Sequence, residues 1–150
     1  MKKWFFIVLA VTVVIVGAFA FFKNGGEDRI TAEREIPTPK VTVGGKEIPT
    51  VLGSRVTDAI YDTAGALDLM KNQEPTAVIS GAEISVAFDV VPGTLVLQRL
   101  DTEGNVVSEE NLKQLKVFVV PSEKGVYVYN LNAWWKPIGS ANFAFKIKVD

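Results

Sequence analysis

The segment from Trp4 to Phe22 most constrains this chain, because it holds nineteen successive uncharged and mainly apolar residues. A helix of that length, at about 1.5 Å per residue, nearly matches a hydrocarbon core of about 30 Å. A buried helix of a soluble core is disfavoured, because the segment has no polar face to meet solvent. We therefore predict one N-terminal transmembrane or signal helix over residues 1–22.

Basic residues set the expected orientation of this helix. Lys2 and Lys3 precede it, and Lys23 is the basic residue that follows it directly. Basic residues are retained on the cytoplasmic side, so the N-terminus is expected there. We predict a single-pass protein of the cell membrane whose C-terminal domain lies outside the cytoplasm.

Cleavage near Ala20 is the alternative to a retained helix. Ala18–Ala20 has the small residues of an A-x-A cleavage site after a basic start and an apolar run, and cutting there would secrete the domain. Phe21 and Phe22 prolong the apolar run beyond that site to a spanning length. These two residues favour the anchor.

The rest of the chain divides into a tether at residues 23–39 and a domain at residues 40–150. Gly25-Gly26, mixed charges and Pro37–Pro39 are typical of an irregular linker. All seventeen acidic residues lie after Lys23, so the part outside the membrane carries a small excess of acid. Such a balance disfavours nucleic acid as a partner.

The chain contains neither cysteine nor histidine. This composition excludes disulfides, a lipid-modified cysteine, zinc-thiolate sites, thiol nucleophiles and the commonest general base. A serine nucleophile would need a Ser-x-x-Lys arrangement, and the sequence has none. We predict a protein that is not an enzyme and has no cofactor.

A β-hairpin is expected at the start of the domain. Lys40–Val43 and Lys46–Ile48 flank Gly44-Gly45, and a Gly-Gly loop suits the positive φ angles of tight hairpin turns. Pro49 cannot donate to a sheet ladder, so the second strand is expected at an edge or interrupted there.

Strict alternation marks a further strand at Glu83–Val90. Its apolar residues Ile84, Val86, Phe88 and Val90 recur at every second position and are predicted to share one face against a core.

Other short segments have the same β character. A turn is expected at Asp101–Asn105, and a short helix is expected to close before Pro75. Several short strands without long helices between them favour a mostly β sandwich over a parallel α/β fold. The further strands predicted are Thr94–Leu100, Lys116–Val120, Val126–Trp134 and Asn142–Val149.

The segment Glu123–Tyr129 resembles the start of strand F in immunoglobulin-like domains, where a turn leads into a structural tyrosine. The resemblance makes Tyr127 the tyrosine corner, with its ring in the core and its hydroxyl bonded to nearby backbone. It implies an immunoglobulin-like β-sandwich and says nothing about activity.

Three segments resemble small extracytoplasmic proteins of Bacillus-like Gram-positive bacteria, some of which are lipoproteins. They are Lys40–Ser54, Glu123–Tyr129 and Phe143–Val149. The resemblance implies location and fold, and no activity. Where related chains have Tyr-Cys-Trp, this chain has Arg55–Thr57, so no disulfide is carried over.

Trp134-Trp135 is the strongest candidate for a binding surface, together with the following Lys136. Adjacent strand residues point to opposite faces, so both rings are buried only if both faces are covered. One exposed ring would stack on a sugar or enter a partner's pocket. In the alternative reading both rings cap the ends of the sandwich.

Calcium ligation is a weaker hypothesis. Asp58, Asp62 and Asp68 supply carboxylates in an irregular segment, but their spacing matches no calcium loop. Asp101–Asn105 is oxygen-rich, and a solvated hairpin turn explains it better.

The leading functional hypothesis is a non-catalytic, membrane-anchored module that binds a protein or cell-envelope ligand. The first alternative is an accessory subunit whose helix pairs with a membrane partner through Gly17 and Ala18. The second is a small envelope hydrolase, which would require two close carboxylates in a pocket.

Overall fold

The computed structural model describes residues 35–112 and 116–150. The helix predicted over Trp4–Phe22 and most of the predicted tether lie outside these residues. Among the residues that are described, no helix has the length and apolar character needed to cross a membrane.

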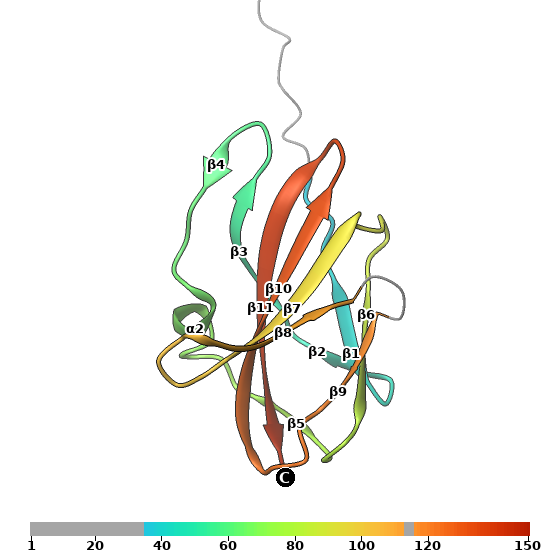
Figure 1. Cartoon of the computed structure of the whole chain (residues 1–150), viewed down its shortest axis with the longest axis vertical. Coiled ribbons are helices and arrows are strands. Elements are labelled where there is room, and N and C mark those ends of the chain that lie inside the picture. Colours follow the sequence, from blue (N-terminus) through green and yellow to red (C-terminus); the bar gives the residue numbers. More distant parts are fainter. Residues whose placement is uncertain (1–34, 113–115) are drawn as a thin grey trace, which may run out of the picture. The chain divides into compact units, whose positions relative to one another are not determined.

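The described residues fold mainly into two β-sheets, and Figure 1 shows the long strands β10 and β11 side by side. In order across the first sheet lie β2 (Lys46–Ile48), β1 (Lys40–Val43), β6 (Glu83–Ala87) and β9 (Val117–Val119). The order across the second is β4 (Ile60–Tyr61), β3 (Val51–Val56), β11 (Gly139–Val149), β10 (Gly125–Trp135), β7 (Thr94–Leu100) and β8 (Val106–Asn111).

One further strand belongs to the second sheet, and a short helix lies outside both sheets. β5 (Thr76–Val78) pairs with the end of β11 in parallel, whereas all the other strand pairs are antiparallel. The helix α2 (Ala66–Leu69) forms in the segment where a short helix was predicted. Two such sheets with a common core are consistent with the predicted mostly β sandwich.

The first hairpin is confirmed. β1 pairs with β2, and Gly44 and Gly45 have φ angles of 53° and 82°. Positive φ at both loop residues is the condition for a tight hairpin turn, and glycine meets it without steric cost. β2 ends before Pro49 at the edge of its sheet, as predicted.

β6 carries the alternation predicted for it, with one exception. Ile84, Val86 and Phe88 are buried, but Val90 is 48% exposed. The prediction that Val90 faces the core is wrong: the strand ends at Ala87, and the alternation continues only to the adjacent Phe88.

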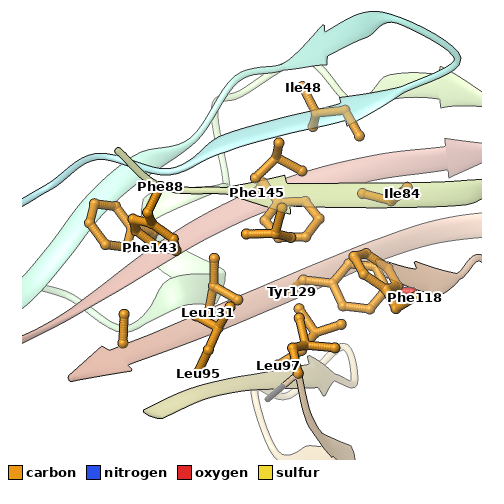
Figure 2. Packing of buried hydrophobic residues seen from close by; sticks show 14 of the residues in the cluster. Ile48, Ile84, Phe88, Leu95, Leu97, Phe118, Tyr129, Leu131, Phe143 and Phe145 are labelled. Atoms are coloured by element: carbon orange, nitrogen blue, oxygen red, sulfur yellow. The ribbon is translucent and has the colours of Figure 1, made fainter. Parts of the chain in front are cut away.

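Both sheets contribute aromatic residues to the core, as Figure 2 shows. Phe118 of β9 lies 5.2 Å from Tyr129 of β10 between ring centroids, and Tyr129 stacks on Phe145 of β11 at 5.2 Å. Burial raises the pKa of Tyr129 to about 12. These rings hold the two sheets together without a disulfide.

α2 covers one end of the outer face of the second sheet. Its residue Ala66 and the following Met70 pack on Val128 and Ala144, and the Lys146 ammonium donates to the Met70 carbonyl at 2.6 Å. The other end of this face lies outside that cluster.

The core also includes a residue that precedes the first strand. Ile36 is 9% exposed and belongs to the main core cluster, four residues ahead of Lys40.

Candidate functional site

The two adjacent tryptophans lie on opposite faces of β10. Trp135 is 2% exposed; its ring meets Phe88 edge-on at 5.3 Å, and its indole N–H donates to the Val90 carbonyl at 2.8 Å. Trp134 is 43% exposed on the outer face of the second sheet. One ring therefore belongs to the core and the other to the surface.

Lys136 follows directly after β10 and stays beside the exposed ring. Its ammonium lies 5.7 Å from the centroid of the Trp134 ring, within the range of a cation–π contact. Of the three residues predicted as a binding surface, Trp134 and Lys136 meet at the surface, whereas Trp135 does not.

Strand register places a row of side chains across the outer face at the level of Trp134. Trp134 pairs with Thr94 of β7 on one side and with Ser140 of β11 on the other. Ser140 in turn pairs with Val56 of β3, and Val56 with Ile60 of β4. Directly opposed residues share a face. The exposed ring is therefore flanked by hydroxyl groups, with apolar side chains continuing the row.

A second row lies two residues away along β10 and β11, on the same face, and its side chains are polar. Asn132 of β10 pairs with Asn142 of β11. The Asn132 side-chain amide donates to the side-chain oxygen Oε1 of Gln98 at 2.9 Å, and the Asn142 side-chain amide donates to Oδ1 of Asn130 at 3.2 Å. The Asn130 amide also donates to the side-chain oxygens of Gln98 and Asn132, so these neutral amides form one hydrogen-bonded network on the outer face.

One buried oxygen atom of this network has no hydrogen-bond partner among the residues that the structure describes. This atom is the side-chain oxygen Oδ1 of Asn142. It lies against Gly53, where an added Cβ would come within 2.6 Å of this oxygen. An unpaired buried acceptor costs about 1–3 kcal/mol. Such costs are typical of functional sites.

Members of both rows line the floor of an open groove of about 590 Å³: Trp134, Thr94 and Ser140 from the first row, and Asn132 and Asn142 from the second. Its wall on the β3–β4 side includes Arg55 and Tyr61, with the guanidinium 4.0 Å from the tyrosine ring centroid. Ser54 and Asp62 also line this wall, and the serine hydroxyl donates to the carboxylate at 2.8 Å. The size falls within the range of about 300–1,000 Å³ of small-ligand sites. We name it the Trp134 groove.

Most residues of the groove were not predicted from the sequence. Asn130 and Asn132 are separated by two positions on β10, and this period already indicated a polar patch on the face that also carries Trp134. Tyr61 lacked any such signal, because its strand has only two residues.

Tyr127 lies outside the Trp134 groove. Its hydroxyl donates to the backbone oxygen of Glu123, four residues upstream, at 2.9 Å, and its ring is partly buried against the core. It lines a second hollow of about 780 Å³ near α2, together with Lys146. In this hollow the Tyr127 hydroxyl and the Lys146 ammonium already bond backbone oxygens.

The acidic residues considered for calcium are not gathered into a site. Among residues 35–112 and 116–150, no group of three or more carboxylate, histidine or cysteine side chains is placed to hold a metal. Asp101 accepts hydrogen bonds from the backbone and the side chain of Asn105, and these lower the pKa of Asp101. Its carboxylate therefore organises the β7–β8 turn.

The chain was compared with known proteins. No protein-family model matches it, and no curated protein matches it significantly.

Proposed function

We propose that this protein is a non-catalytic, membrane-anchored module with an immunoglobulin-like fold that binds a cell-envelope component outside the cytoplasm. The observation that carries the binding role is the Trp134 groove, in which a 43% exposed indole lies in an open hollow of about 590 Å³. A large aromatic ring left half-exposed beside uncommitted polar groups is typical of a binding surface.

The fold assignment has support from the corner at Tyr127. Its hydroxyl bond to the Glu123 backbone, together with two mainly antiparallel sheets, fits the tyrosine corner of immunoglobulin-like domains. The location has support from the apolar run Trp4–Phe22, and the resemblance to Gram-positive extracytoplasmic proteins agrees with it.

Location is tested first, and the absence of cysteine makes the test clean. Each of two variants introduces a single thiol. Lys3→Cys places it before the apolar segment, and Lys46→Cys places it at an exposed position of β2. In intact cells a membrane-impermeant maleimide should label only the Lys46→Cys protein. Labelling of the Lys3→Cys protein instead would reverse the orientation, and a mature chain beginning at Phe21 would replace the anchor with secretion.

Binding is tested by sedimentation of the purified full chain with isolated envelope material. The Trp134→Ala variant should remain in the supernatant, whereas Val126→Ala should sediment like the parent. Val126 is the matched control, because it is 56% exposed on the same strand but lies outside the Trp134 groove. Equal sedimentation of both variants would refute the role of the groove. Loss of sedimentation only when the apolar segment is replaced would favour the accessory-subunit alternative.

A further inference from the structure

We infer that the Trp134 groove takes an uncharged pyranose oligosaccharide. This inference rests on the proposed binding function and specifies the chemical class of its ligand. Four properties of the groove support it: its position on a sheet face, its charge, its uncommitted hydrogen-bonding groups and its aromatic rings.

The floor of the groove offers no free backbone groups to pair with a ligand. Its floor is the middle of the second sheet, where β10 is paired with β7 on one side and with β11 on the other. Backbone N–H and C=O groups are therefore used within the sheet. An extended peptide that adds a strand needs a free sheet edge. Recognition on this floor must come from side chains.

The charges around the groove are few and already engaged. Arg55 lies over Tyr61, the Asp62 carboxylate accepts from Ser54, and the Lys136 ammonium lies over Trp134. Between them lie apolar side chains and neutral polar groups, namely the amides of Asn132 and Asn142 and the hydroxyls of Thr94 and Ser140. Polyanionic ligands are bound by clustered cations, and an ionic ligand would leave its charge poorly compensated here. The floor suits a neutral ligand.

The uncommitted groups of the floor both donate and accept. The hydroxyls of Thr94 and Ser140 make no hydrogen bonds to the described residues, and they flank Trp134 on its two neighbouring strands. The Asn132 amide donates one N–H to Gln98, and its oxygen accepts one hydrogen bond from Asn130. Its second N–H and the second lone pair of its oxygen are left for a ligand. Sugar hydroxyls need such mixed partners, since each one donates and accepts.

The aromatic rings supply the other half of sugar recognition. One face of a pyranose ring presents C–H groups, and these pack on the flat, electron-rich face of an indole or a phenol. Trp134 offers such a ring within the groove, and Tyr61 is a second ring on its wall. Stacking on Trp134 would place sugar hydroxyls above Thr94, Ser140 and Asn132.

The test is calorimetric titration of the full chain in phosphatidylcholine nanodiscs, because detergents with sugar headgroups would compete. The probes are cellotetraose, N-acetylchitotetraose and maltotetraose, with an acidic oligogalacturonate as the charged comparison. At least one neutral tetrasaccharide should bind, and Trp134→Ala should weaken its affinity by about tenfold or more. Trp134→Phe should recover part of that loss, and Val126→Ala should bind like the parent.

A second variant probes the polar half of the groove. Asn132→Ala should weaken binding of the same sugar by several-fold, while stacking on Trp134 persists. Thermal unfolding of each variant shows whether the groove is intact, and a variant with an unchanged melting temperature and unchanged affinity counts against the inference. Binding of the acidic probe alone, or no binding of any neutral sugar, overturns it. If Trp134-dependent sedimentation with envelope persists in that case, the proposed function stands and only the sugar is wrong.

Discussion

Replacing Trp135 with alanine should cost far more stability than the same change at its neighbour Trp134. A buried tryptophan removes about 150–250 Å² from water, which corresponds to about 4–6 kcal/mol at about 25 cal/mol per Å². Trp135 is 2% exposed, so nearly all of this area is removed from water on folding. The area term is an upper bound, and measured losses for such changes are about 3–5 kcal/mol. We expect a loss of about 4 kcal/mol for Trp135→Ala.

Trp134 is 43% exposed, so its truncation returns a smaller area to water and leaves no enclosed cavity. A loss of about 2 kcal/mol is expected for Trp134→Ala. Trp135→Phe separates the ring from its donor: it keeps an aromatic ring but loses the indole bond of 2.8 Å to the Val90 carbonyl. Its expected cost is about 1–2 kcal/mol.

Pulse proteolysis of the full chain across a urea series measures these losses, because it reads the folded fraction without using tryptophan emission. A difference of about 2 kcal/mol between Trp135→Ala and Trp134→Ala is the expected result. Equal losses in the two variants would refute the assignment of one ring to the core and the other to the surface. A larger loss for Trp134→Ala would reverse it.

Three further predictions concern backbone geometry, the corner and the core. Gly139→Ala should destabilise the protein by several kcal/mol, because φ is 129° at this residue and an added Cβ would collide with the Val56 carbonyl. A melting temperature within a degree of the parent would contradict this prediction. Tyr127→Phe should lower the free energy of unfolding by about 1 kcal/mol through loss of the bond to Glu123, measured by urea unfolding, and no loss would make that bond energetically neutral. Burial raises the pKa of Tyr129 from 10.0 to about 12, so the folded state favours its neutral form and stability should fall as the pH rises from 10 through 12. Tyr129→Phe should reduce this alkaline loss, and an unchanged pH profile would show that Tyr129 does not cause it.

Local patterns predicted the strands whose information is carried by neighbouring residues. The Gly44-Gly45 turn and the alternation of Ile84, Val86 and Phe88 were read correctly, because turn geometry and the two-residue period are properties of the chain itself. The failure at Val90 has a local cause as well, since the period predicts a face only while the strand continues.

The strands that the sequence analysis missed depend on partners distant in the chain. β5 has three residues and is held by parallel pairing with the end of β11, about seventy positions later. All six residues of β8 are exposed at the sheet edge, so it lacks the hydrophobic alternation that identifies a half-buried strand. In both cases pairing with another strand, and not local preference, makes the segment a strand.

The sequence by itself determined that Trp134 and Trp135 point to opposite faces, that no disulfide is formed, and that an apolar run of spanning length precedes the domain. Only the tertiary structure decided which tryptophan is exposed, because that depends on which face of β10 meets the other sheet. It also decided what surrounds the exposed ring: Thr94 and Val56 are far from Trp134 in the chain and join its row through strand register. Alternation is a local property of the backbone, whereas a row across a sheet arises only when separate strands pair.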